Sequence, residues 1–119
     1  MTRSIRPRLY DIDANIDVVL ARVAGRQPED LATDLDLRYV LLHAFMIIAE
    51  AANKLPEPVR QQSPQVPWQD IIGMGTKIKH EYHRIDLNIL WDAATVHLPT
   101  LRPIVKQLLV NTENTLAPV

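Results

Sequence analysis

The chain has 119 residues, of which 47% are apolar and 23% are charged, and its formal net charge at neutral pH is −1. This length suits one globular domain with a single hydrophobic core, and the balance of charges excludes a global attraction to nucleic acid. Any affinity for a polyanion would therefore need a local basic patch. The chain contains no cysteine, which excludes disulfide bonds, thiolate metal sites and thiol nucleophiles.

The sequence has no pattern typical of export or of a membrane span. Residues 1–8 carry three arginines, and no apolar run follows them, so they do not resemble a secretory signal. The most apolar stretch, residues 39–52, is too short to cross a bilayer and contains His43 and Glu50. We therefore expect a soluble, cytoplasmic protein without a membrane partner.

Apolar residues recur at helical spacing over residues 9–23, which predicts a first helix with Gly25 as its carboxyl-terminal cap. Asp34 is a suitable cap for a long second helix over about 35–55, which Pro56 would end. The apolar positions of this second helix cover more than one of its faces. We therefore expect it to lie at the centre of a helical bundle.

A proline-rich connection follows over residues 56–67, and one short turn is expected around Val59. Pro67 can serve as the first residue of a third long helix, because its missing N–H costs nothing there. The apolar stripe of this helix continues to Ile85, and Asp86 is a suitable cap for a fourth helix.

Two further apolar stripes of helical spacing occupy residues 87–98 and 101–109. Pro99 and Pro103 are expected to break or bend this pair, since proline removes a hydrogen bond and clashes with the preceding turn. The polar residues 111–119 are expected to fray.

No alternation typical of strands is present, so the pattern predicts an all-α fold. We expect one domain over residues 1–119, with its core at about 9–109, folded as an up-and-down bundle of four to five helices.

Three segments carry a resemblance to a known family. Residues 47–56 read Ile-Ile-Ala-Glu-Ala-Ala-Asn-Lys-Leu-Pro and resemble the Ile-Ile-Gly-Glu-Ala-Ala-Lys-x-Leu-Pro of bacterial HepT-like proteins of the HEPN superfamily. Residues 66–74 are similar to that family's Ile-Pro-Trp-x-x-Ile-x-Gly-Met. His80 and Tyr82 then match the end of its motif Gly-Met-Arg-Asn, three residues, His-x-Tyr. Further pairs follow at the family's spacing: Ile85-Asp86, Leu90-Trp91 and Leu98-Pro99-x-Leu101.

The order and spacing of these segments identify the chain as a member of this family over about residues 9–109. The resemblance implies a two-fold homodimer whose motifs meet in a shared cleft and cleave RNA, rather than DNA, without a metal or other cofactor. It also implies a toxin paired with a small nucleotidyltransferase antitoxin of the MntA type. That enzyme would silence the toxin by transferring AMP to the motif tyrosine, here Tyr82.

The motif departs from the family at Gly75, which stands in place of arginine, and at Thr76, which stands in place of asparagine. His80 is the candidate for proton transfer, because histidine is the side chain most often used as a general acid or base at neutral pH. Arginine would stabilise the charge that develops on the phosphoryl oxygens, and losing such a contact costs roughly 3 to 4 kcal/mol, or about two to three decades in rate. We therefore expect weakened cleavage, which Gly75→Arg would restore.

Other cations near His80 offer a substitute for the lost arginine. Lys77 lies one helical turn before His80 and is the candidate catalytic cation. Lys79, His83 and Arg84 are candidate contacts to RNA phosphates. A solvated basic helix face without any ligand would carry the same residues.

Helical geometry divides the motif further. On an uninterrupted helix, position 75 lies about 140° around the axis from His80, but almost directly below Tyr82. We therefore expect Gly75 and Tyr82 to share one face and Lys77 to share the other with His80. Gly73, which matches the family, is expected at a close contact between helices.

Several alternatives remain for these residues. Tyr82 could be a core residue of the apolar stripe, and His80, His83 and Asp86 recur at a spacing that could bind a metal ion. His43 is expected in the core or a cleft, and His97 at the surface near a helix end.

The function also has alternatives to a toxic nuclease. The chain could be a catalytically inactive HEPN binding module, the substrate-binding subunit of a nucleotidyltransferase, or a helical dimer unrelated to RNA.

Overall fold

The computed structural model describes residues 5–116, with side chains described for residues 5–112, and within this range the chain is helical and contains no strand. The all-α prediction is therefore confirmed. The elements are α1 (Ile5–Val23), α2 (Asp30–Thr33), α3 (Leu35–Lys54), α4 (Glu57–Gln61), α5 (Trp68–Glu81), the 3₁₀ turn η2 (Tyr82–Arg84), α6 (Leu87–Asp92), the π-helical turn η3 (Ala93–His97) and α7 (Leu98–Leu116).

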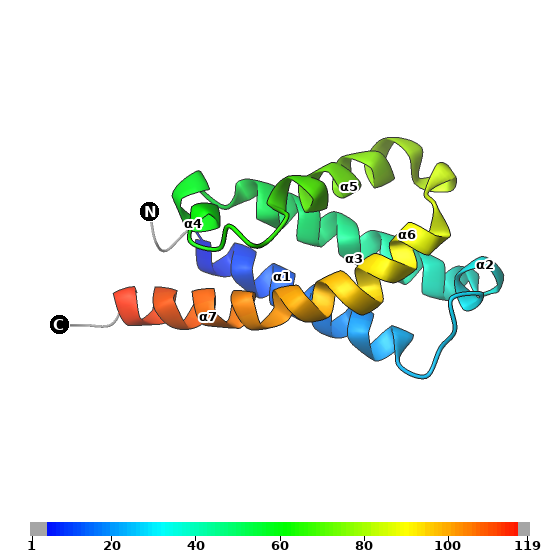
Figure 1. The fold of residues 1–119 in the computed structure, drawn as a ribbon, viewed down its shortest axis with the longest axis horizontal. Coiled ribbons are helices and arrows are strands. Elements are labelled where there is room, and N and C mark those ends of the chain that lie inside the picture. Colours follow the sequence, from blue (N-terminus) through cyan, green and yellow to red (C-terminus); the bar gives the residue numbers. More distant parts are fainter. Residues whose placement is uncertain (1–4, 117–119) are drawn as a thin grey trace.

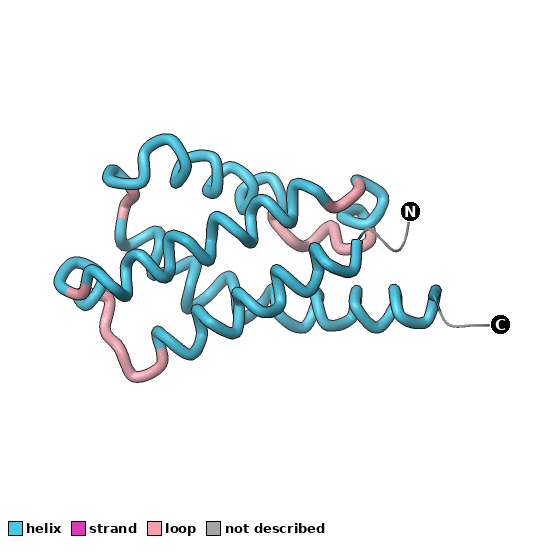
Figure 2. The backbone as a smooth tube through the Cα atoms, turned by 180° about the vertical axis from the view of Figure 1, so that it is seen from behind, coloured by secondary structure: helices cyan, strands magenta, loops and turns pink. Residues whose placement is uncertain are grey.

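Four long helical passes run alternately up and down (Figure 1). They are α1, α3, α5 and the continuous run of α6, η3 and α7. α1 and α3 pack against each other at the centre, α5 packs on α3, and α7 packs on α1. The view from behind shows the same order, with the connections at the two ends (Figure 2). The up-and-down bundle is as predicted.

The structure confirms the helix caps that were predicted at Gly25, Asp34 and Asp86. Gly25 has a φ of 73°, which glycine adopts without a Cβ penalty after a helix end. The Asp34 carboxylate accepts a hydrogen bond from the Leu37 backbone N–H, and the Asp86 carboxylate accepts from Asn88 in the same way. Both aspartates therefore cap the helices that follow them.

One hydrophobic core joins all the long helices. α3 contributes buried residues on more than one of its faces, which confirms its predicted central place. The largest fully buried side chains come from α1, α2, α3, α6 and α7 and from Leu55, which follows α3. They are Leu9, Ile12, Ile16, Val19, Leu31, Leu41, Ile48, Leu55, Leu90, Leu98 and Val105.

Of the break or bend predicted at Pro99 and Pro103, the break is absent, because the chain stays helical from α6 through η3 to α7. The π-turn η3 ends at His97, two residues before Pro99, and the Leu98 N–H donates to the Ala93 carbonyl five residues back. This wider turn shifts the hydrogen-bond pattern where a proline N–H is missing. α7 also continues to Leu116 through part of the segment expected to fray; residues 117–119 lie outside the described range.

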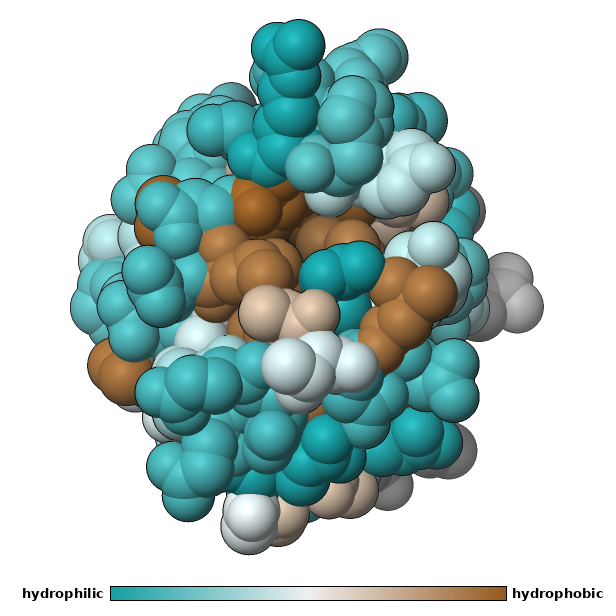
Figure 3. Space-filling view, turned by 90° about the vertical axis from the view of Figure 1, so that its right-hand side faces the viewer, coloured by the Kyte–Doolittle hydropathy of each residue, from teal (hydrophilic) through white to brown (hydrophobic). Residues whose placement is uncertain are grey.

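At the end of the bundle formed by α2, η2 and α6, apolar side chains gather in a hollow ringed by hydrophilic residues (Figure 3). Exposed or half-buried apolar residues at this end include Leu35, Ile85, Leu87 and Ile89. None of the described helices is long and apolar enough to span a membrane.

Candidate functional site

α5 carries the motif residues, and Trp68 anchors its first turn. This side chain is buried, and its indole N–H is shared between the carbonyls of Arg60 at 3.0 Å and Ser63 at 3.1 Å. The helix begins one residue later than predicted, because Pro67 has a ψ of 70° and precedes the first helical residue. The short turn expected around Val59 is present as α4.

The motif helix has a buried side and an exposed side. Gly75 and Ile78 are buried against the rest of the bundle, whereas Lys77, Lys79 and His80 are exposed. This alternation follows from helical periodicity, since residues 75 and 78 lie about one turn apart. His80 is therefore open to solvent.

The helix ends at Glu81, where the backbone turns to a φ of −141° and a ψ of 39°, and Tyr82 begins the separate 3₁₀ turn η2. The prediction of one continuous stripe to Ile85 is therefore wrong. Gly75 and Tyr82 do not share a face, because Gly75 is buried and Tyr82 is 55% exposed. The interpretation of Tyr82 as a core residue is also wrong.

The carboxyl-terminal end of α5 and the turn η2 together form what we call the basic corner: Lys77, Lys79, His80, His83 and Arg84. All five side chains are exposed, and none has a hydrogen-bond or ion-pair partner among the residues that the structure describes. The Tyr82 and His83 rings meet edge to face, with centroids 5.4 Å apart. The corner thus presents cations beside an exposed aromatic ring.

A groove lies along one side of α5 because this helix packs on α3 and stands away from α7. Its volume is about 710 Å³, and its lining is mainly apolar, with Phe45, Met74 and Leu101 among the residues. Lys77 and His97 lie on its border. The sequence contains no signal for this groove, since it depends on the distance between helices that are remote in the chain.

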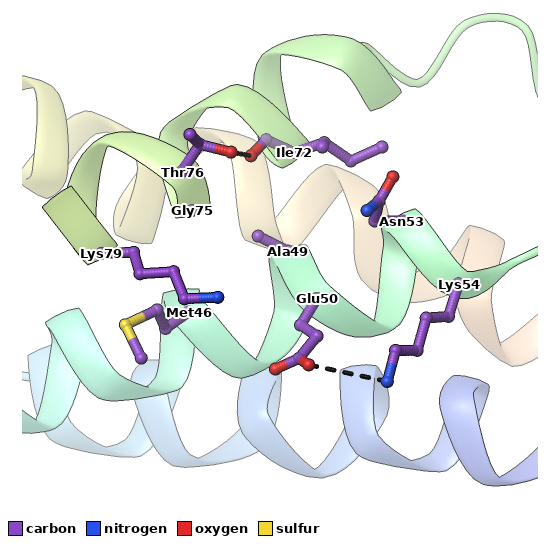
Figure 4. A pocket seen from close by; sticks show the side chains of 9 residues that line it. All are labelled: Met46, Ala49, Glu50, Asn53, Lys54, Ile72, Gly75, Thr76 and Lys79. Atoms are coloured by element: carbon purple, nitrogen blue, oxygen red, sulfur yellow. Dashed lines mark hydrogen bonds and ion pairs between the residues drawn. The ribbon is translucent and has the colours of Figure 1, made fainter.

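A smaller pocket of about 180 Å³ lies on the other side of α5, against α3 (Figure 4). Gly75 and Ala49 form its floor, and Lys79 extends toward it from α5. The Glu50 carboxylate lies 3.6 Å from the Lys54 ammonium at its border. Lys77 and Lys79 therefore lie beside different cavities, although only one residue separates them.

The two glycines of α5 have opposite environments. A Cβ added to Gly75 would overlap the Cβ of Ala49, whereas a Cβ added to Gly73 would meet nothing within 4 Å. Gly73 is exposed, so the prediction that it marks a close helix contact is wrong. Gly75 marks that contact instead.

The remaining candidates are placed as follows. His43 is exposed on α3, so its expected place in the core is wrong, whereas His97 is exposed, as predicted. Among the described residues no three His, Cys, Asp or Glu side chains come together so as to hold a metal ion. His80, His83 and Asp86 thus do not form the metal site that their spacing suggested.

Comparisons with known proteins agree with the family resemblance of the segments around the motif. A family model described as Ribonuclease HepT-like matches residues 12–108. The chain is 34% identical over 104 residues to "Putative RNase TTE0752" of Caldanaerobacter subterraneus subsp. tengcongensis, covering 87% of this chain and 93% of that protein. It is 28% identical over 102 residues to "Probable ribonuclease HepT" of Thermococcus cleftensis, covering 86% and 93%. No solved structure matched the chain.

Proposed function

Because the chain belongs to the HepT-like ribonuclease family, we propose that it is the toxin of a toxin–antitoxin pair and acts on RNA as a homodimer. The observation that carries this proposal is the basic corner, where cations with no partner among the described residues lie near the exposed His80. Phosphates of a single RNA strand would supply the missing negative charge. The proposed activity is weak, since position 75 has no side chain.

The proposed reaction needs a proton acceptor and a cation. His80 removes the proton of a ribose 2′-hydroxyl, and the oxygen forms a bond to the adjacent phosphorus. The bond from this phosphorus to the 5′-oxygen of the next nucleotide breaks, and the leaving oxygen takes a proton from solvent water, so that a 2′,3′-cyclic phosphate remains. Lys77 is assigned the stabilisation of the phosphoryl charge because it lies one turn before His80 on the exposed side of α5. Lys79, His83 and Arg84 hold neighbouring phosphates.

A second protomer has a chemical role in this proposal. Gly75 is buried against α3, whereas His80 is exposed, so the two ends of the motif do not face a common site within one chain. Bringing the basic corners of two protomers together would place cations opposite His80. It would also concentrate positive charge, which only a bound polyanion would relieve.

Tyr82 is the proposed point of regulation. Its exposed phenol is accessible to a partner nucleotidyltransferase, and its oxygen would form a bond to the α-phosphorus of ATP as pyrophosphate leaves. The attached AMP adds a negative charge beside His83, the ring of which contacts Tyr82. This charge would compete with RNA phosphates for the basic corner.

The second candidate is an inactive binding module that keeps the bundle and its partner but performs no chemistry. The burial of Gly75 against Ala49 favours it, because no cation can extend from this position. A role as the substrate-binding subunit of a nucleotidyltransferase belongs to the same class.

The two candidates differ in toxicity and in cleavage. We expect expression without the partner enzyme to slow bacterial growth, and the purified protein to cleave single-stranded RNA without added metal. His80→Ala should lower the cleavage rate by about 10²-fold or more, and Lys77→Ala should also lower it. His43→Ala, which changes an exposed histidine of α3, should leave the rate unchanged. Harmless expression and no cleavage by the parent protein would establish the binding module instead.

Regulation has a separate test. Incubation with ATP and a nucleotidyltransferase of the proposed antitoxin type should add the mass of one AMP to the parent protein and none to Tyr82→Phe. AMP that is still added to Tyr82→Phe would rule out this tyrosine as the acceptor.

A further inference from the structure

We infer that Ala49 is the residue that decides whether position 75 can carry a side chain, and so whether the motif can regain a cation there. The inference rests on the proposed function for its effect on RNA, but its steric part stands on the contact between α3 and α5. These two helices meet at Ala49 and Gly75, both of which are buried. Figure 4 shows the Ala49 side chain directed toward Gly75.

The obstacle at this contact is a single methyl group. The Cβ of Ala49 is the nearest atom that an added Cβ at Gly75 would overlap, and the next nearest neighbour, the Ala49 Cα, lies at an ordinary contact distance of 3.6 Å. A methyl group on a short side chain cannot rotate away from the contact, since alanine has no χ angle to change. Relief therefore requires a shift of α3 against α5 or the removal of the Ala49 methyl group.

Beyond this obstacle there is space for a long side chain. The pocket beside Gly75 has a volume of about 180 Å³ and is bordered by polar groups of Glu50, Asn53 and Thr76. Glu50 is largely exposed and holds Lys54 only through a 3.6 Å contact, which leaves its carboxylate able to accept a guanidinium. An arginine at position 75 would thus find room and a partner once its Cβ is accommodated.

This geometry changes the expectation for the motif. Gly75→Arg alone forces α3 and α5 apart, so that it destabilises the protein before its charge can act. Ala49→Gly combined with Gly75→Arg keeps the helix distance and lets the guanidinium extend along the pocket. Ala49 is therefore a positioning residue, since it acts on the motif only through position 75.

The steric part is tested by a reciprocal exchange, measured as melting temperature. Gly75→Ala should lower the melting temperature by roughly 5 to 15 °C, as expected for overpacking. Ala49→Gly with Gly75→Ala should return it to within a few degrees of the parent, because one alanine and one glycine remain at the contact. Gly73→Ala, the matched control in open space, should raise it by about 2 to 6 °C. A rise for Gly75→Ala, or strictly additive effects in the double variant, would overturn the inference.

The functional part compares Gly75→Arg with Ala49→Gly/Gly75→Arg for RNA cleavage and growth arrest. We expect the double variant to melt at a higher temperature than the single one and to cleave about 10²-fold faster than the parent. A double variant that regains stability but cleaves no RNA supports the steric role of Ala49 and overturns the proposed nuclease function. A single variant that is as stable and as active as the double one overturns the inference itself.

Discussion

Charged side chains cluster at two corners of the molecule. At one corner they pair with each other, and at the other they have no partner among the described residues. Where α1, α2 and α3 meet, the Arg26 guanidinium contacts the carboxylates of Asp30 at 3.2 Å and Asp34 at 2.7 Å. Those carboxylates also accept backbone N–H groups, from Gln27 and Leu37. All three charged groups of this cluster thus stabilise the connection between α1 and α3.

At the basic corner, by contrast, five cationic or titratable side chains project into solvent without a partner among the described residues. Nothing in the local fold depends on their charges. Three of these side chains, Lys77, Lys79 and Arg84, are cations, and together they outnumber the exposed Glu81 in the same segment, so the local charge favours a ligand of negative sign. The comparison therefore separates charges that stabilise the fold from charges available to a polyanion.

The largest expected effect lies on the buried side of the same helix. Ile78 is 2% exposed and lies between Lys77 and Lys79 in the sequence. Ile78→Ala should lower the free energy of unfolding by about 2 to 5 kcal/mol, because it removes buried methyl groups and leaves a cavity. Urea denaturation would measure this, with Lys79→Ala as the control, expected within about 0.5 kcal/mol of the parent. Equal effects for the two variants would show that α5 does not bury Ile78.

An intermediate effect on stability is expected at the cluster of Arg26, Asp30 and Asp34, and this effect should depend on pH. The backbone N–H of Gln27, followed by Arg26, lowers the pKa of Asp30 below its usual 3.8, and Arg26, followed by the Leu37 N–H, lowers the pKa of Asp34. A lowered folded-state pKa stabilises the protein above the unfolded value, and this stability is lost as the pH falls through the folded value.

The parent should therefore lose stability as the pH is lowered through and below about 4. Asp34→Asn keeps a side chain that caps helices well but removes the charge facing Arg26. This variant should be less stable than the parent at neutral pH and should lose less stability on acidification. Melting temperatures between neutral and acidic pH would test this, and parallel curves for the two proteins would contradict the ion pair's contribution.

The smallest effect on stability is expected for Lys77→Ala, within about 0.5 kcal/mol, since the side chain is exposed and unpaired. Its affinity for a single-stranded oligoribonucleotide should fall, and the slope of log affinity against log salt should decrease by about 0.7 for one lost phosphate contact. Arg22→Ala, an exposed cation on α1, is the control and should keep the parent slope. Identical slopes for all three proteins would remove Lys77 from the RNA contact.

Much of the fold was predictable because it rests on local rules. Apolar spacing located the long helices, and Gly25, Asp34 and Asp86 marked their ends through cap chemistry that acts within four residues. The failures concern places where several weak local preferences compete. Glu81 leaves the helical conformation before Tyr82, and the π-turn before Pro99 keeps the last helix continuous.

Some features of the candidate site were likewise predictable from the sequence, and others were not. Helical spacing alone predicted that Lys77 and His80 lie on one exposed side of α5, and it failed for Tyr82 because the spacing rule holds only within an uninterrupted helix. Helical periodicity groups Gly75, and not Gly73, with the buried Ile78, but the two glycines have the same intrinsic helix preference, and periodicity does not show which residue Gly75 contacts. Their difference comes from Ala49, on another helix and far away in the sequence.

The all-α class, the order of the helices, the family and the identity of the motif residues follow from residue type and spacing, and could be read from the sequence. The sequence also has alanine at position 49 and glycine at position 75, where the resembled segments carry glycine and arginine. That these two departures touch each other is seen only in the packing of α5 on α3. The physical reason is that close packing between helices depends on the shapes of both surfaces, and neither helix specifies the shape of the other.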